Sequence, residues 1–217
     1  MVNLCKKQKL LFPLYCITAE EYSLGRSNIE VARDIFSSGV KILQYREKEK
    51  SKKNKFAECL KIRRMAYRAK ATLIINDDID IALAVKADGV HLGQSDMPAV
   101  VARRLVGKAM IIGVSTHSVQ QAKQAVKDGA DYIGVGPIYP TRTKRDVCPA
   151  VGLEYLDYVS KNVDLPFVAI GGIKRHNLCQ VRAHGALVIA MITEIVSAPD
   201  IRRRIREILA LIFLPLK

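Results

Sequence analysis

Positively charged side chains follow one of the short apolar runs of this 217-residue sequence. Arg46 and Lys48 stand two positions apart, and they suit an oligophosphate because arginine offers a planar fork of donors and lysine a point charge. In an extended chain, Gln44 and Arg46 lie on the same face as Val40 and Ile42. This face is typical of a buried core that opens into a polar pocket, although a charged strand end on the surface is an alternative.

Two carboxylates follow neighbouring apolar runs. Asp77 comes directly after Ile75 and Asn76, and Asp96 follows the next run along the chain. Either Asp77 or Asp78 alone is better explained as the cap of a following helix. Taken as a pair, Asp77 and Asp96 favour Mg²⁺, which proteins usually hold with one or two carboxylates plus substrate phosphates.

A serine and two histidines belong to the next runs. Ser115 suits either of two roles with the same geometry, as the cap of a following helix or as a hydroxyl donor to a phosphate. We expect His117 to lie in a first helical turn with a structural role. His91 alternates with Val90 and Leu92, so we expect it to pack beneath a helix.

Paired glycines and a hydroxyl-rich loop mark the last part of the chain. Gly171 and Gly172 end an apolar run and free backbone amides, which is typical of a phosphate-binding corner. The stretch GPIYPTRTK leaves the preceding run, and its Thr141, Thr143 and Lys144 are expected to face a ligand.

The elements that must position these residues recur regularly along the chain. Amphipathic helical segments separate eight short β-rich runs, which span 14–18, 40–45, 72–76, 89–92, 110–114, 132–135, 167–170 and 186–190. This alternation predicts an α/β fold, the (β/α)₈ TIM barrel, whose active site lies at the carboxyl ends of the strands. An open doubly wound sheet is the main alternative, but it would normally have a glycine-rich first turn, and 17–21 contains no glycine.

The domain organisation follows from the same pattern. We expect a single domain over 1–217, with an N-terminal extension at 1–12 and an active-site flap at 136–152 that closes over the ligand. No apolar run approaches the roughly 18 residues that cross a bilayer. Lysines before the apolar residues 10–12 resemble the start of a signal peptide, but Pro13 interrupts the apolar stretch and no small-residue cleavage site follows, so we expect a first strand there.

Composition narrows the functional class. The formal charge of +14 suits nucleic acid, acidic membranes or small anions, but an aromatic content of 6% weakens the nucleic-acid hypothesis. The five cysteines show no CxxC spacing, so we expect reduced thiols and no structural metal. The charge alone does not choose among these partners. Together with the candidate phosphate and metal residues above, it leads us to expect a cytoplasmic enzyme for small anionic substrates that binds neither nucleic acid nor membrane; a homo-oligomer stays open.

Six motifs in order carry a resemblance to a known family. They are QYREK at 44–48, INDD at 75–78, DGVHLGQSD at 88–96, GVSTH at 113–117, GADYIGVGPIYPTRTK at 129–144 and VAIGGI at 168–173. With these motifs the chain resembles the thiamine phosphate synthases over nearly its whole length. The resemblance implies a transferase of thiamine biosynthesis that joins 4-amino-2-methyl-5-hydroxymethylpyrimidine diphosphate to 4-methyl-5-(2-phosphoethyl)thiazole, releasing pyrophosphate with the help of Mg²⁺.

The resemblance also implies roles for individual residues. Those expected to hold the pyrimidine diphosphate are Gln44, Arg46, Lys48, Asn76 and Ser115, with Lys144 in contact with the diphosphate. Those expected to bind the thiazole phosphate are Thr141, Thr143, Gly172, Ile192 and Thr193. Asp77 and Asp96 are expected to hold Mg²⁺, and the residues expected to assist the departure of pyrophosphate are Arg46, Lys48, Ser115 and Lys144. Thr193 departs from the serine that is common in the family, but it keeps a hydroxyl.

Two alternatives stay open at this point. The thiazole tautomerases share the barrel but lack the metal-binding carboxylates, so Asp77 and Asp96 argue for the synthase. A noncatalytic barrel that binds a phosphate ligand, or a basic nucleic-acid-binding protein, has no need of a carboxylate pair among its cations.

Overall fold

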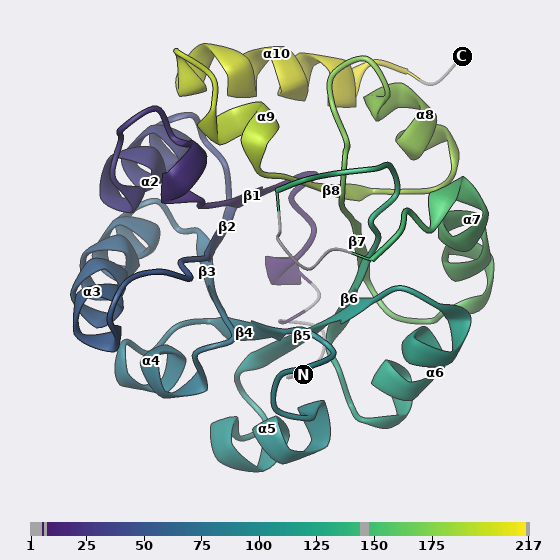
Figure 1. Cartoon of the computed structure of the whole chain (residues 1–217), viewed down its shortest axis with the longest axis horizontal. Helices are drawn as coiled ribbons and strands as arrows, with labels where there is room; N and C mark the ends of the chain where they lie inside the picture. The colour runs from purple at the N-terminus through teal and green to yellow at the C-terminus, as the bar shows by residue number, and fades with distance from the viewer. Residues whose placement is uncertain (1–5, 7, 144–147, 216–217) are drawn as a thin grey trace.

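The chain closes into a barrel of parallel strands surrounded by helices, as Figure 1 shows in a view along the barrel axis. The computed structural model describes residues 6, 8–143 and 148–215. In chain order the strands are β1 (Leu14–Ile17), β2 (Ile42–Tyr45), β3 (Thr72–Asn76), β4 (Gly89–Leu92), β5 (Ile111–Thr116), β6 (Tyr132–Val135), β7 (Phe167–Ala169) and β8 (Val188–Met191). Each strand pairs in parallel with the next, and β8 pairs with β1. The predicted (β/α)₈ TIM barrel is confirmed.

Helices follow the strands, and short polar side chains cap some of them. They are α2 (Asn28–Ser37), α3 (Lys52–Arg68), α4 (Ile79–Ala84), α5 (Ala99–Val106), α6 (Val119–Lys127), α7 (Gly152–Asn162), α8 (Leu178–Ala183), α9 (Thr193–Val196) and α10 (Ile201–Phe213), with a 3-10 turn, η1, at Glu20–Tyr22. Ser27 and Glu30 form a capping box before α2, and Ser51 and Ser118 cap α3 and α6. These caps therefore fix where α2, α3 and α6 begin.

The core lies on both sides of the strands. Leu73, Ile74 and Ile75 follow one another in β3, and each has 0% of its surface exposed. A parallel sheet that is covered by helices on one side and fills its own interior on the other requires such continuous apolar runs. For that reason, the alternation of apolar and polar residues does not show which side chains of a strand point into the barrel and which point toward the helices.

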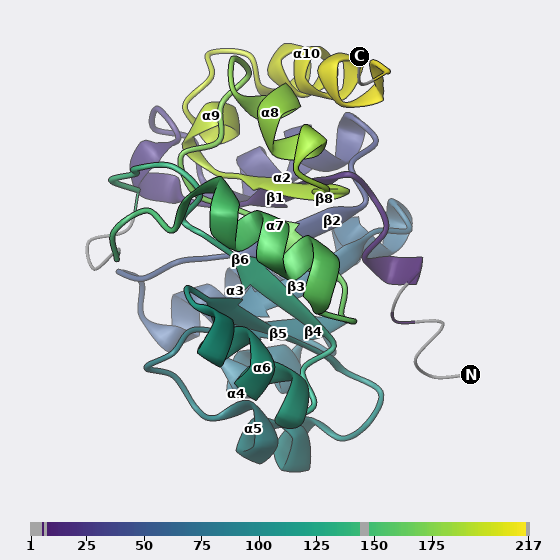
Figure 2. The same ribbon diagram turned by 90° about the vertical axis from the view of Figure 1, so that its right-hand side faces the viewer.

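The N-terminal segment lies against the end of the barrel opposite the loop after β6, as Figure 2 shows from the side. Lys6 Nζ pairs with Asp131 at 2.9 Å and Lys9 Nζ with Asp88 at 2.6 Å, while Leu10 is buried. These contacts fasten the segment to the amino ends of the strands. The segment therefore does not cover the opposite end of the barrel, where the carboxyl ends of the strands are expected to form the active site.

The ends of some elements differ from the sequence prediction. Strand β5 runs to Thr116, so Ser115 lies within the strand and is not the cap of the next helix. Ser118 has that role, because its side chain accepts a hydrogen bond from the Gln121 amide. His117 accordingly lies before the cap and not in the first helical turn as expected. No helix in the described part of the chain is long and apolar enough to cross a membrane.

Candidate active site

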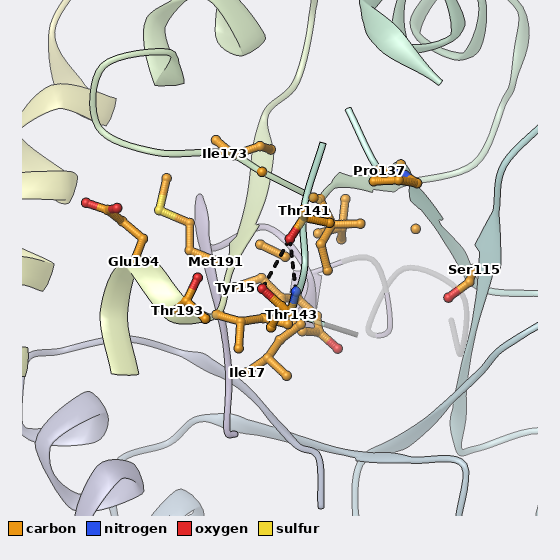
Figure 3. Close-up of a pocket in the computed structure, with 18 of the residues that line it drawn as sticks. Tyr15, Ile17, Ser115, Pro137, Thr141, Thr143, Ile173, Met191, Thr193 and Glu194 are labelled. Atoms are coloured by element: carbon orange, nitrogen blue, oxygen red, sulfur yellow. Dashed lines mark hydrogen bonds between the residues drawn. The ribbon is translucent and has the colours of Figure 1, made fainter. Parts of the chain in front are cut away.

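A cavity of about 490 Å³ opens at the carboxyl ends of the strands. Residues from every strand except β3, or from the loops that follow these strands, line it, and Figure 3 shows part of this lining. The predicted site residues among its lining are Gln44, Arg46, Ser115, Thr141, Thr143, Gly172, Ile192 and Thr193. The sequence placed these residues in separate motifs, and the barrel brings them together around one hollow.

Gln44 and Arg46 enter this cavity from β2. Both are buried, with 3% and 7% of their surfaces exposed, as the inward register of the strand requires. The Arg46 backbone is held on both sides, because its amide donates to Thr18 Oγ1 and its carbonyl accepts from that same hydroxyl. Within the described residues the Arg46 guanidinium has no hydrogen-bond partner. A buried, unpaired guanidinium that lines a cavity is suited to an anionic ligand.

The paired glycines after β7 let two loops approach closely. Gly171 and Gly172 have φ angles of +98° and +64°, which side chains rarely adopt. A Cβ on Gly171 would lie 2.4 Å from Pro137, and one on Gly172 would lie 2.7 Å from the Pro140 carbonyl oxygen. Backbone groups of these two loops therefore pack together at the corner of the cavity, where a phosphate needs amides and hydroxyls.

Hydroxyl groups occupy the same corner. Thr141 and Thr143, after β6, join their hydroxyls at 3.1 Å, as the dashed line in Figure 3 marks. Thr193 begins α9 directly after Ile192, which places its hydroxyl beside the same hollow. Lys144 falls outside the described residues.

Lys174 is a cation of this corner that the sequence analysis missed. Its ammonium donates to Thr193 Oγ1 at 3.1 Å and lies 3.6 Å from Glu194, and both Lys174 and Glu194 line the cavity. The signal available in the sequence was a lysine two positions after the paired glycines. A lysine at such a position is easily taken for the solvated start of the next helix. The reason is that the alternation of side-chain directions along the strand does not continue through a glycine turn.

The two predicted metal ligands meet at the rim formed by β3 and β4. Burial and the adjacent carboxylate of Asp96 raise the pKa of the Asp77 carboxyl above its ordinary value. Asp77 has a left-handed φ of +61°, and the Gly93 amide donates to Asp96 at 2.7 Å. Two carboxylates held this close repel each other, and a hard divalent cation is a group that relieves the repulsion. The donor set fits Mg²⁺.

Lys48 reaches the same rim and not the cavity itself. Its ammonium lies 2.5 Å from Asp77 Oδ2, with 52% of the side chain exposed. Asn76 ends β3 beside Asp77. The cavity lining includes none of Lys48, Asn76, Asp77 and Asp96. Among the described residues, the predicted site therefore has two parts, an enclosed cavity and a charged rim.

A second expectation about the histidines is wrong, in addition to the position of His117. His91 does not pack beneath a helix but turns into the barrel, where its ring nitrogens lie 2.9 Å from the Tyr132 hydroxyl and 2.9 Å from Ser115 Oγ. His117 also lines the cavity, and its Nδ1 donates to the Gly136 carbonyl, which ties it to the backbone. The apolar neighbours of His91 misled the prediction, since strands of a barrel are apolar on both faces.

The family model and two of the curated relatives that match this chain share one activity in their names. The family model described as thiamine monophosphate synthase matches residues 14–195. A thiamine-phosphate synthase from Pelotomaculum thermopropionicum is 59% identical over 199 residues, covering 92% of this chain and 91% of that protein. Another, from Lawsonia intracellularis, is 52% identical over 195 residues, covering 90% of each chain.

A solved structure agrees with these sequence matches. The thiamine phosphate pyrophosphorylase from Pyrococcus furiosus superposes with a TM-score of 0.86 at 33% identity, covering 94% of this chain and 97% of that one. A 3-hexulose-6-phosphate synthase with a TM-score of 0.65 and 18% identity shares the fold alone. The resemblance expected from the six motifs is thus confirmed, and the chain belongs to the thiamine monophosphate synthase family.

Proposed function

We propose that this enzyme joins 4-amino-2-methyl-5-hydroxymethylpyrimidine diphosphate to 4-methyl-5-(2-phosphoethyl)thiazole, giving thiamine phosphate and pyrophosphate. The observation that supports it best is that two features lie side by side. One is a cavity that contains Arg46 and a phosphate corner, and the other is a rim with two carboxylates. The reaction needs both parts, because one substrate carries a phosphate that must be held and the other a diphosphate that must leave.

The bond changes call for charge stabilisation and no protein nucleophile. The CH₂–O bond of the pyrimidine diphosphate breaks first, and its electron pair departs with pyrophosphate. The thiazole ring nitrogen then forms the new C–N bond with the CH₂ carbon. The barrier falls when developing negative charge on the leaving group is met by fixed cations and donors. Mg²⁺, when held by Asp77 and Asp96, would supply a large share of that charge.

The chain's own residues divide the remaining work. Arg46 presents its guanidinium to the diphosphate from inside the cavity, and Ser115 offers a hydroxyl from β5. Lys48 and Asn76 contribute from the rim, and Lys144 from the flap at 136–152 that is proposed to close over both substrates.

The thiazole phosphate is proposed to lie in the corner. Gly172 and Ile192 offer backbone amides there, while Thr141, Thr143 and Thr193 offer hydroxyls. Lys174 adds a cation that is already in contact with Thr193. This arrangement orients the ring nitrogen toward the diphosphate side of the cavity and excludes water from the reactive carbon.

Single-domain organisation over 1–217 and a cytoplasmic location complete the proposal. The four cysteines of the described residues, Cys16, Cys59, Cys148 and Cys179, are free thiols, which supports a reducing compartment.

A two-substrate assay tests the function. With both substrates and Mg²⁺, we expect pyrophosphate and thiamine phosphate to appear in equal amounts, and excess chelator to stop the reaction. Each substrate alone should give no product. Conversion of a thiazole isomer without the pyrimidine would instead identify a tautomerase, and full turnover in excess chelator would contradict the metal role.

A further inference from the structure

Five side chains form a continuous hydrogen-bonded chain across the floor of the cavity. Gln44 Nε2 donates to the Tyr15 hydroxyl at 3.0 Å, and the hydroxyls of Tyr15 and Tyr132 lie 2.9 Å apart. His91 then bridges Tyr132 to Ser115 Oγ, with 2.9 Å at each ring nitrogen. The chain joins strands β1, β2, β4, β5 and β6 and ends on two residues proposed to hold the pyrimidine diphosphate.

The barrel leaves room for this hydrogen-bonded chain because two strands, β5 and β6, each have a glycine at an interior position. A Cβ on Gly113 would lie 2.1 Å from the Tyr132 ring and 2.5 Å from His91 Nδ1. One on Gly134 would lie 3.4 Å from His91 Cε1. The register pairs His91 with Gly113 and Ser115 with Gly134. The polar chain thus occupies interior positions that a TIM barrel usually fills with branched apolar residues.

The donors and acceptors give the chain one direction. The amide nitrogen of Gln44 only donates, so the Tyr15 oxygen accepts and the Tyr15 proton is left for Tyr132. In that direction Tyr132 donates to His91 Nδ1, and the His91 ring carries its proton on Nε2, facing Ser115. Burial raises the pKa of both tyrosines, so both remain protonated donors at neutral pH.

The opposite direction leaves a buried proton unmatched. If Ser115 donated to His91 and the ring donated onward, Tyr15 would accept from both Tyr132 and Gln44. Its own proton would then have no acceptor among the described residues, although Tyr15 is only 1% exposed. An unmatched buried donor costs about 1–3 kcal/mol, which favours the first direction.

We propose that this chain fixes His91 as the Nε2–H tautomer, so that His91 donates to Ser115 and the Ser115 proton is left to bond the departing diphosphate. Figure 3 shows the Ser115 side chain directed from β5 into the cavity. The proposal rests on the proposed function for the identity of the anion. His91, Tyr132 and Tyr15 act through Ser115 and are positioning residues.

This direction also distinguishes His91 from a general base. A histidine that activates a serine nucleophile must accept the serine proton, whereas here the ring donates to the serine oxygen. A hydroxyl that accepts from one side becomes a better donor on the other, because hydrogen bonds in a chain polarise one another. Ser115 would therefore favour the transition state, in which charge on the diphosphate oxygens grows, over the bound substrate.

Tyr132→Phe tests the proposal, with two matched variants. It removes the group that satisfies His91 Nδ1, so we expect a mixture of the two ring tautomers in place of the single Nε2–H form and a fall in kcat of about tenfold, with the KM of the thiazole phosphate unchanged. Tyr15→Phe leaves the Tyr132–His91 bond intact, so the tautomer should persist and kcat should fall about threefold at most. Tyr155→Phe removes an equally buried bond, to Thr116 at 2.8 Å, outside the cavity, and should leave kcat unchanged.

The tautomer is read directly by ¹⁵N NMR of the imidazole nitrogens, with the signals of His91 assigned by their loss in His91→Asn. This measurement uses the protein alone, so its outcome is independent of the assay for pyrophosphate. A failed assay would refute the proposed function and leave the tautomer result standing. An Nδ1–H tautomer in the wild type, or an unchanged tautomer in Tyr132→Phe, would overturn the inference.

A double-mutant cycle completes the test. If Tyr132 acts only through Ser115, Tyr132→Phe should cost nothing further in kcat when Ser115→Ala is already present. Additive losses from the two changes would overturn the proposed route through Ser115. Thermal unfolding of each variant shows whether the barrel is retained; should Tyr132→Phe fail to fold, the same tautomer exchange and cycle are measured in Tyr132→Met.

Discussion

The rim at β3 and β4 and the corner at β7 and β8 offer binding groups of different kinds. At the rim, Asp77 and Asp96 lie together, and Lys48 pairs with Asp77 at 2.5 Å, so the lysine offsets part of the negative charge of the two carboxylates. At the corner, Gly171 and Gly172 shape a backbone cradle with hydroxyls around it. The corner is organised before a ligand arrives, whereas the rim must exchange partners to take one.

This difference matches the two tasks of the proposed reaction. A thiazole phosphate stays bound through the reaction, so fixed amides and hydroxyls suit it. Pyrophosphate must be stabilised as it leaves and then be released, which suits mobile charges that can return to one another. Variants that separate the rim from the corner therefore sharpen the comparison.

The largest effect is expected at the rim. Asp77→Asn keeps the size of the side chain but removes one of two carboxylates, so kcat/KM should fall about 1,000-fold, comparable to the loss of one strong transition-state contact. Pyrophosphate release measured with both substrates and Mg²⁺ gives the ratio. Asp80→Asn is the control, because Asp80 forms an exposed ion pair with Lys52 at 2.5 Å and should keep nearly full activity. Near-normal turnover in Asp77→Asn would remove the metal role from this rim.

At the corner, backbone shape should matter next most. Gly172→Ala forces a side chain into φ +64° and places its Cβ 2.7 Å from the Pro140 carbonyl oxygen, so one of the two loops must move. We expect kcat/KM to fall about 100-fold, mainly through the KM of the thiazole phosphate, since such strain and displacement cost about 1–3 kcal/mol or more. Gly129→Ala introduces a similar backbone strain at φ +76° with no atom within 4 Å, and it should leave KM unchanged. Equal losses in both variants would show that stability and not the cradle is affected.

The cation of the corner should contribute less than its shape. Lys174→Met keeps the length of the side chain and removes its charge, so we expect the KM of the thiazole phosphate to rise about tenfold, as loss of a charge-assisted contact predicts, with kcat within about twofold. The KM of an unphosphorylated thiazole should not change. Arg175→Met removes a neighbouring charge that pairs with Glu207 at 2.7 Å and also lies 3.5 Å from Glu194, so it controls for the general electrostatic field, including the effect on Glu194. If Arg175→Met had the same effect, contact between Lys174 and the phosphate would be excluded.

The sequence predicted the barrel because each strand and helix has a signal in its own stretch of residues. Short β-rich runs and amphipathic helical segments alternate along the chain. It also predicted which polar residues end the strands, since those positions interrupt apolar runs. The inward direction of Gln44 and Arg46 followed because polar residues there replace apolar ones on one face only.

The interior histidine and the corner lysine could not be predicted in the same way. His91 lies between Val90 and Leu92, and in a strand that is buried on both faces such neighbours do not say which face is interior. That direction depends on the closure of the barrel and on glycines at 113 and 134 in other strands. Lys174 follows two glycines with positive φ, beyond which no period fixes where a side chain points. Both are decided by contacts between segments that lie far apart in sequence.

The smallest expected effect concerns the exchange of partners at the rim. Lys48 holds Asp77 through an ion pair that is half exposed, and such pairs are worth up to about 1 kcal/mol. Because Mg²⁺ would take over the same carboxylate, Lys48→Met should tighten Mg²⁺ binding to the free protein about threefold, while the KM of the pyrimidine diphosphate rises. Titration calorimetry with Mg²⁺ alone measures the first quantity, and Lys52→Met, which removes a lysine paired with Asp80, should leave it unchanged. Weaker Mg²⁺ binding in Lys48→Met would mean that Lys48 supports the carboxylate pair and does not compete for it, and the rim would then be as preorganised as the corner.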